Sequence, residues 1–207
     1  MDTQGLTILP RPMVWLLDLL ALWHEPVYEK RSSLAFTRVF RMAWSGHRLA
    51  IKVIECSDPS ARALLFREHM FLRTLRSPHV ASYRGYLVRG HRYVLVTDWI
   101  EGFCLEDNGH LLRAVLSTRA GFALFTHECT GIVDLLRNAG IRHRDLREKN
   151  IIVSDAMPVL FDFGWAVWHD EVDAFTPSAL PKALMDDATA MAAVLGRLQA
   201  DRREQMV

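Results

Sequence analysis

Residues 141–166, IRHRDLREKNIIVSDAMPVLFDFGWA, form the stretch around which the rest of the chain is organised. Two short apolar runs, one directly after Asn150 and one directly before Asp162, are separated by the sequence DAMP, a pattern typical of a β-hairpin. Because the two ends of a hairpin lie close together, we expect Asp145, Asn150 and Asp162 in one small region. Their oxygen atoms, with a flanking cation such as Arg147, suit Mg²⁺ and phosphate.

Two motifs in this stretch, HRDLREKN and the DFG that begins twelve residues after Asn150, resemble the catalytic and metal-binding loops of the protein-kinase superfamily. By this resemblance, Asp145 is the base that orients the acceptor hydroxyl, and Arg147 faces the γ-phosphate. Asn150 and Asp162 are then the Mg²⁺ ligands. The alternative is a chance polar loop that ends in a turn, and the occurrence of both motifs at hairpin distance disfavours it.

A second pair of charged residues lies in apolar surroundings. Lys52 is within RLAIKVIE, the second of two strands expected over residues 33–55, and Glu68 falls on the apolar stripe of a helix expected to begin at Asp58 and Pro59. The other members of this stripe are Leu64, Phe71 and Leu75. Because a lone carboxylate on such a stripe is costly, we expect Glu68 to pair with Lys52. The resemblance implies that the pair positions Lys52 on the α- and β-phosphates of ATP. The alternatives are a lysine that extends to water from a strand edge and a solvated glutamate.

Residues 80–86 and 92–99 are expected to be two further strands. The run YVLVTDWIEG resembles the kinase strand that leads into the hinge between the lobes. Thr97 would then lie beside the nucleotide pocket, and backbone groups of Asp98 and Ile100 would pair with adenine. An ordinary edge strand followed by a turn is the alternative.

The glycine-rich nucleotide loop of the family has no counterpart here, because residues 32–38 contain no glycine. Glycine at such a place lets the backbone approach phosphate closely. In its absence, the hydroxyls of Ser32 and Ser33 are the expected phosphate donors.

The C-terminal part is expected to be helical. Apolar residues over 118–139 recur at intervals of three and four, and Gly140 is suited to end the helix just before His143. We expect His143 to fix the loop by hydrogen bonding. Asp187, or Asp186 as an alternative, is expected to hold the backbone of that loop, to cap the final helix, or both. No APE motif follows, and Thr176 and Ser178 are candidate phosphorylation sites.

Composition limits the other possibilities. The 207 residues carry 25 basic and 24 acidic side chains, which excludes a basic footprint for nucleic acid. Three widely spaced cysteines fit free thiols in a reducing compartment. The apolar run 13–23 is too short to cross a bilayer. It is expected to be a helix packed on the domain, with contact to a membrane or partner as the alternative.

These observations predict an α+β protein with a minimal two-lobed kinase-like fold and a truncated C-lobe. An N-terminal helical extension would cover 1–27, a sheet with one helix 28–97, and a helical lobe 98–207. The expected activity is ATP- and Mg²⁺-dependent phosphoryl transfer to a protein Ser/Thr. A lipopolysaccharide core sugar, as in compact bacterial kinases, is an alternative acceptor, and a pseudokinase acting as a binding module is the alternative function. The expected location is the cytoplasm, peripheral contact with an inner membrane, or a host cytosol after secretion.

Overall fold

The computed structural model describes residues 26–32, 35–56, 59–107, 118–170 and 186–204, with residues 59–65 described by their backbone alone. The predictions for residues 13–23, Ser33, Asp58, Leu64, Thr176 and Ser178 concern positions or side chains outside this description. The chain folds into two compact units. The first contains the described residues through Arg73 together with Ala81–Trp99, and the second contains Thr74–Val80 and the residues from Ile100 onward.

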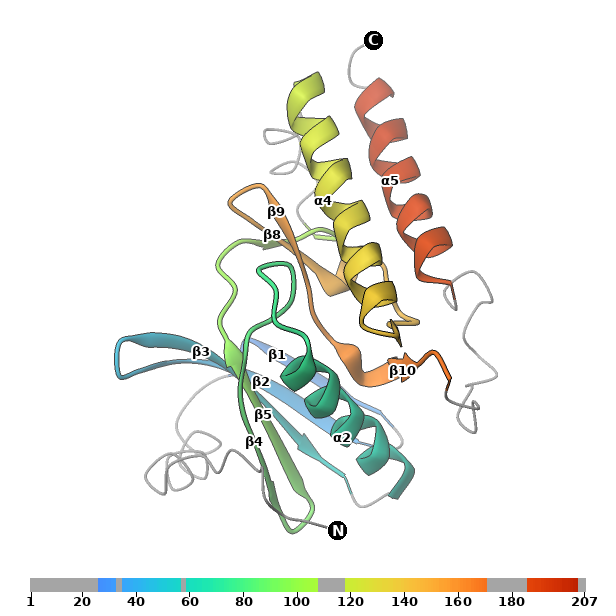
Figure 1. The fold of residues 1–207 in the computed structure, drawn as a ribbon. Coiled ribbons are helices and arrows are strands. Elements are labelled where there is room, and N and C mark those ends of the chain that lie inside the picture. Colours follow the sequence, from blue (N-terminus) through green and yellow to red (C-terminus); the bar gives the residue numbers. More distant parts are fainter. Residues whose placement is uncertain (1–25, 33–34, 57–58, 108–117, 171–185, 205–207) are drawn as a thin grey trace. The chain divides into compact units, whose positions relative to one another are not determined.

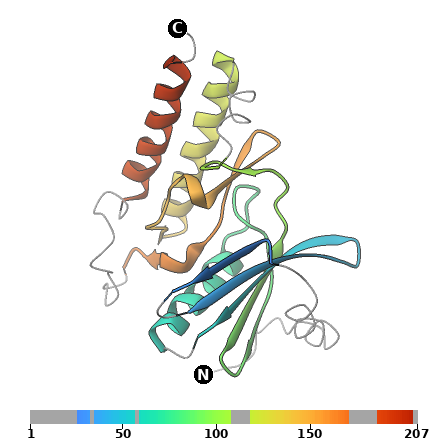
Figure 2. The same ribbon diagram turned by 180° about the vertical axis from the view of Figure 1, so that it is seen from behind.

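The first unit is an antiparallel sheet with one helix (Figure 1). Its strands lie in the order β1 (Tyr28–Arg31), β2 (Phe36–Trp44), β3 (His47–Glu55), β5 (Arg92–Asp98) and β4 (Tyr83–Arg89). Helix α2 (Pro59–Thr74) lies against one face of this sheet, in front of it in Figure 1 and behind it in Figure 2. Strand β1 is an additional edge strand for which the sequence pattern gave no separate prediction.

The sheet register determines which side chains face α2. Lys52 is paired with Val39 on β2 and with Leu95 on β5. Because side chains alternate between the two faces of a strand, Ile51 and Val53 point the other way. They join a buried apolar cluster with Phe40, Met42, Leu49, Val94 and Val96. The apolar face therefore holds the sheet together, and the face that carries Lys52 is left for the helix.

The predicted strand over 80–86 is wrong at its beginning, because β4 begins at Tyr83. Val80 belongs instead to the second unit, where it forms a parallel bridge with Leu160 and is 2% exposed. Val80 could be buried equally well in strand β4 or against Leu160 in the second unit, so the local apolar pattern could not show which of the two it joins.

The second unit combines two long helices with short strands. Helices α4 (Arg119–Asn138) and α5 (Asp187–Glu204) run side by side in opposite directions in both views (Figures 1 and 2). Strands β6 (Phe103–Cys104), β8 (Ile151–Ser154) and β9 (Met157–Leu160) form one sheet, and β7 (Ile141–Arg142) pairs with β10 (Val167–Trp168). The predicted α+β fold class is confirmed, with strands dominating the first unit and long helices the second.

Helix α4 begins and ends where the sequence indicates. The Thr118 side chain accepts a hydrogen bond from the Gly121 N–H at the N-terminus, and Gly140 has a φ of 68° just beyond the C-terminus. The buried stripe of α4 consists of Phe125, Cys129, Ile132, Val133 and Leu136. Helix α4 therefore delivers the chain directly into β7 and the HRD motif.

The predicted hairpin is formed by β8 and β9, but its turn is shorter than the four-residue loop expected. Ile151 pairs with Leu160 and Ser154 with Met157, so only Asp155 and Ala156 remain in the turn. Both turn residues have positive φ, 48° and 66°, as a two-residue type I′ turn requires. One further hydrogen bond extends the pairing beyond the two strands: the Phe161 N–H donates to the Asn150 carbonyl oxygen at 3.1 Å. Phe161, the residue before Asp162, therefore lies beside Asn150.

Gly102 is required where the chain passes the hairpin. A Cβ atom at this position would lie 2.1 Å from the Val153 carbonyl oxygen, and φ is +145°. A side chain would therefore push β6 away from β8.

Among the described helices, none is both long and apolar enough to cross a membrane. Cys56, Cys104 and Cys129 are free thiols.

Candidate active site

The centre of the second unit is the buried carboxylate of Asp145. A single 3-10 turn, Glu148–Asn150, follows it and turns the Asn150 side chain back toward it. The Asn150 Nδ2 atom donates to the Asp145 backbone oxygen at 2.7 Å and to its Oδ2 at 2.9 Å. Since the amide nitrogen is committed to these two acceptors, the amide oxygen is the Asn150 atom suited to a cation.

Two cations approach the same carboxylate. Arg147 Nε lies 2.7 Å from Asp145 Oδ1, and Lys149 Nζ lies 3.6 Å from Oδ2. The Arg147 contact is short, yet neither Asp145 Oδ1 nor Arg147 Nε has an aligned hydrogen-bond partner within the described part of the chain. We therefore treat this contact as a charge interaction, which leaves Oδ1 able to accept a hydrogen bond from a substrate hydroxyl.

His143 joins the loop that carries Asp145 to the segment that carries Asp162. Its Nδ1 accepts from the Asp145 N–H at 3.3 Å, and its Nε2 lies 3.2 Å from the Phe161 carbonyl oxygen. These partners require a neutral ring with the proton on Nε2. Burial lowers the pKa of His143 by desolvation and favours this neutral form, although the carboxylates of Asp187, Asp162 and Asp145 act in the opposite direction. His143 is thus a structural link, as the sequence suggested.

Asp187 and Asp186 divide the two roles that the sequence left open. Asp187 Oδ2 accepts from the His143 N–H at 2.7 Å, and its Oδ1 accepts from the Arg144 N–H at 3.0 Å. Asp186 caps α5 through the Ala188 N–H at 3.1 Å and the Thr189 hydroxyl at 2.7 Å. Asp187 therefore fixes the backbone of the loop, and Asp186 caps the N-terminus of α5.

Asp162 lies directly after the hairpin in a left-handed conformation, with φ 62° and ψ 68°. Such a conformation costs about 1 kcal/mol or more in a residue with a Cβ atom and is typical of functional sites. A Cβ at Gly164 would lie 3.5 Å from Asp162 Oδ1, which is an ordinary van der Waals contact, so this glycine borders the carboxylate without being required by it. Phe163 is fully buried and its ring meets that of His143 edge-on at 4.7 Å. Packing of the next residue thus helps to fix Asp162.

The residues suited to a divalent cation are Asp162 and Asn150. No cluster of three or more His, Cys, Asp or Glu side chains with metal-site geometry occurs among the described residues. The backbone of Phe161, the residue before Asp162, is hydrogen-bonded to Asn150, and a carboxylate and an amide oxygen are ligands that suit Mg²⁺, which completes its octahedral shell with water and substrate phosphate. The donor set therefore fits a cation that is brought together with a nucleotide.

In the first unit, Lys52 and Glu68 form a close ion pair. Lys52 Nζ lies 2.9 Å from Oε1 and 2.8 Å from Oε2 of Glu68. The glutamate side chain is 4% exposed and the lysine side chain 22% exposed. The pair joins β3 to α2 and orients the ammonium group while part of it remains accessible.

The residues predicted to contact the nucleotide lie at the end of β5 and between β1 and β2. Thr97 and Asp98 are the last residues of β5, and Ile100 begins the second unit. The Asp98 N–H donates to the Ser82 oxygen at 2.9 Å, so the Asp98 carbonyl is the backbone group suited to a nucleotide. The Ser32 hydroxyl contacts both the N–H and the oxygen of Ala35 at 3.0 Å. Ser32 thus closes a turn, and its contact with phosphate stays a prediction.

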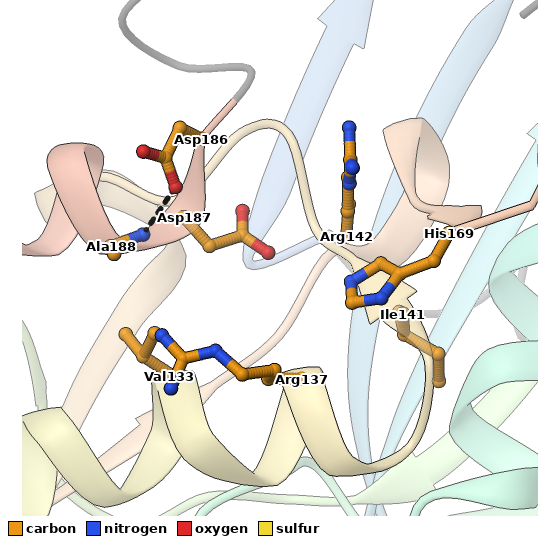
Figure 3. Close-up of a pocket in the computed structure, with 8 residues that line it drawn as sticks. All are labelled: Val133, Arg137, Ile141, Arg142, His169, Asp186, Asp187 and Ala188. Atoms are coloured by element: carbon orange, nitrogen blue, oxygen red, sulfur yellow. Dashed lines mark hydrogen bonds between the residues drawn. The ribbon is translucent and has the colours of Figure 1, made fainter.

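An open pocket of about 290 Å³ lies elsewhere in the second unit (Figure 3). It is lined by Val133, Arg137, Ile141, Arg142, His169, Asp186, Asp187 and Ala188. Figure 3 shows Arg137 lying along α4, with Asp186 and Asp187 at the start of α5 opposite it. None of the predicted catalytic or metal-binding residues lines this pocket, so the pocket and the chemistry are separate features.

Sequence reasoning missed three further contacts. His79 Nδ1 lies 3.1 Å from the Pro158 oxygen, and His79 Nε2 lies 3.1 Å from Glu128 Oε2. Arg197 on α5 binds both carboxylate oxygens of Glu148. These partners are 49 to 79 positions apart in the chain, and no local pattern indicates them.

Comparison with known proteins agrees with this geometry. A family model described as "Protein kinase domain" matches residues 35–177. Human serine/threonine-protein kinase A-Raf is 30% identical over 135 residues, which are 64% of this chain and 22% of A-Raf. The RasGEF domain-containing serine/threonine-protein kinase X of Dictyostelium discoideum is 30% identical over 157 residues, 70% of this chain and 16% of that protein. LIM domain kinase 1 of Drosophila melanogaster is 29% identical over 141 residues, 67% of this chain and 11% of that protein. The chain matches less than a quarter of the length of each of these relatives.

Proposed function

Because this chain belongs to the protein kinase family, we propose that it transfers the γ-phosphoryl group of ATP to a Ser or Thr hydroxyl of a protein, with Mg²⁺ as cofactor. The names of the three relatives contain the word kinase, and two of them contain serine/threonine. A protein acceptor is preferred over a core sugar for this reason. The bacterial type of the enzyme stays a prediction.

The observation that carries the proposal is the state of the Asp145 carboxylate. Asn150 holds Oδ2 by a hydrogen bond, while Oδ1 lacks an aligned hydrogen-bond donor within the described segments. A purely structural buried carboxylate normally has donors on both oxygens. An acceptor hydroxyl placed on Oδ1 would satisfy it and would be aimed by it.

The other residues then have separate tasks. Lys52, oriented by Glu68, binds the α- and β-phosphates. Asn150 and Asp162 hold Mg²⁺, which neutralises charge on the phosphates when it is bound. Arg147 neutralises charge on the transferred group.

In the transfer itself, the acceptor oxygen forms a bond to the γ-phosphorus and the bond to the β–γ bridging oxygen breaks. ADP leaves with the bonding electrons. The hydroxyl proton passes to Asp145, so atoms and charge balance.

A binding module without catalysis is the second candidate, and one observation favours it. The glycine-free turn between β1 and β2 uses the Ser32 hydroxyl to bind Ala35. The family's usual backbone cradle for phosphate is therefore replaced by a closed turn.

Incubation of the purified full chain with Mg²⁺ and γ-³²P-ATP separates the two candidates. We expect label in a Ser/Thr-containing protein such as casein, and loss of about 10²- to 10⁴-fold in rate for Asp145→Asn. Parallel reactions with a core oligosaccharide test the sugar acceptor. Purified protein that labels no acceptor and hydrolyses no ATP would instead support the binding module.

A further inference from the structure

Two cationic side chains, not one, contact the Asp145 carboxylate. Arg147 and Lys149 both contact this single carboxylate, at 2.7 and 3.6 Å. Asn150, its remaining partner, is a neutral amide. If Arg147 serves the transferred phosphoryl group, Lys149 has no task in the chemistry described above.

The acidic residue between the two cations does not balance them. Glu148 is turned toward α5, where Arg197 Nε and Nη2 lie 2.5 and 3.0 Å from its two carboxylate oxygens. The Arg197 hydrogen bond and charge lower the pKa of Glu148 against the desolvation that raises it, so the acid stays ionised and paired. Among the described residues, the ion pair of Lys149 is with the Asp145 carboxylate, which Arg147 also contacts.

Accessibility separates the cations from the acid that they contact. The Asp145 side chain is 3% exposed, whereas the Arg147 and Lys149 side chains are 40% and 33% exposed. A substrate that reaches Asp145 therefore meets a partly exposed ammonium group that lies 3.6 Å from Oδ2 of the same carboxylate whose Oδ1 would orient its hydroxyl. An acidic group on the substrate would be attracted there, and a basic group would be repelled.

We propose that Lys149 is a specificity residue that favours Ser/Thr acceptors in acidic peptides, with an Asp or Glu within two residues of the acceptor. This proposal rests on the kinase function proposed above. The distance limit follows from the reach of an extended chain, which advances about 3.3 Å per residue, so that two residues span roughly the length of a lysine side chain. A lysine also suits this task because its flexible stem can follow a carboxylate on either side of the acceptor.

The test uses the full-length chain and three peptides of identical length with one serine. The residues flanking the serine are aspartates in the first peptide, alanines in the second and lysines in the third. We measure kcat and KM for wild-type protein, Lys149→Gln and Lys149→Glu at low and high salt. Arg203→Gln is the matched control, because it removes one exposed positive charge from the last turn of α5.

We expect the wild type to prefer the aspartate peptide over the lysine peptide by about tenfold in kcat/KM at low salt, as two exposed charge interactions of opposite sign allow. Lys149→Gln should reduce this ratio by about fivefold, and Lys149→Glu should invert it. Most of the change should lie in KM, and high salt should weaken the preference. Arg203→Gln should keep the wild-type ratio.

Each other outcome has a definite meaning. Equal use of the three peptides by active wild-type protein would overturn the acidic preference and leave the kinase function standing. A uniform loss of kcat on all peptides in Lys149→Gln would show that Lys149 positions Asp145, and would also overturn the proposal. Wild-type protein that phosphorylates no peptide and no protein would overturn both.

Discussion

The two units bury their polar side chains in different ways. In the first unit, Lys52 is held by the side chain of Glu68, and the neighbouring His69 lies among aromatic rings, stacked on Tyr86 at 4.5 Å. In the second unit, Asp187 and His143 bind mainly to backbone groups of loops that are far apart in the sequence. A contact between two side chains can be broken by a rotamer change, whereas a contact to the backbone is broken only if the chain changes its path.

This difference indicates separate tasks. The second unit has a fixed arrangement of backbone and carboxylates, which is what electrostatic catalysis requires before substrate arrives. The first unit orients one cation through a single ion pair between a strand and a helix.

The strongest test of the second unit compares two aspartates of the same hairpin region. Asp162 and Asp155 both have positive φ, 62° and 48°, and asparagine tolerates this conformation. We expect Asp162→Asn to reduce kcat by about 10³-fold, because a cation ligand loses its charge. Asp155→Asn, in the exposed turn, should leave kcat unchanged. Phosphoryl transfer to casein is the measurement, and equal activity of the two variants would contradict the assigned role of Asp162.

The backbone anchors should contribute several kcal/mol to stability. Asp187→Ala leaves the buried N–H groups of His143 and Arg144 without their acceptor, which should cost about 3–5 kcal/mol in free energy of unfolding. Asp186→Ala removes only an exposed helix cap and should cost about 1 kcal/mol. Urea denaturation of both variants measures the difference. If Asp186→Ala proved the more damaging change, the division of roles between the two carboxylates would be wrong.

The ion pair of the first unit should show coupling when its two members are replaced. Lys52→Met leaves the buried Glu68 carboxylate without its main cation, and we expect a loss of about 1–3 kcal/mol, reduced by the partial exposure of Lys52. Adding Glu68→Leu should recover part of this stability, while activity stays lost. A double-mutant cycle by urea denaturation measures the coupling. Strictly additive single effects would show that the pair does not stabilise the unit.

His69 and His143 are the two buried histidines among the described residues, and the smallest expected effects concern them. The Nδ1 atom of His69 and the Oη atom of Tyr83 have no hydrogen-bond partner among the described residues. Replacing His69 by Phe keeps the aromatic packing and removes a buried unsatisfied atom, so stability should rise by about 1 kcal/mol. His143→Phe should instead lower stability, because the Asp145 N–H and the Phe161 oxygen lose their partner. Thermal unfolding at pH 7 tests the opposite signs.

The same residues predict a pH dependence. Desolvation lowers the pKa of His69, with a smaller effect from the charge of Arg73, and desolvation also lowers the pKa of His143. Below about pH 6.5 the unfolded chain binds protons that the folded protein excludes, so stability should fall as pH falls from about 7 to 5. His69→Phe should reduce this slope, and His127→Gln, an exposed control on α4, should leave it unchanged. An unchanged slope in His69→Phe would refute the contribution of His69.

Several features could be predicted because they depend on residues close together in the chain. The hairpin, the extent of α4 and the convergence of Asn150 and Asp162 follow from apolar runs, a turn and a capping residue within about 20 positions. The pairing of Glu68 with Lys52 was inferred from the cost of leaving each charge alone among apolar neighbours. In both cases the residues near in sequence already showed which arrangement would leave an apolar or charged side chain in an unfavourable environment.

The remaining features depend on where distant segments meet. Only the orientation of α5 relative to the HRD loop, 43 and 44 positions earlier, decided that Asp187 binds the loop and Asp186 caps the helix. Only the tertiary packing moved Val80 into the second unit beside Leu160. The sequence alone determined which groups are chemically available and how they are spaced along the chain. Their partners across the fold were decided by packing, because hydrophobic burial is non-directional and is satisfied equally well at several places until all elements are assembled.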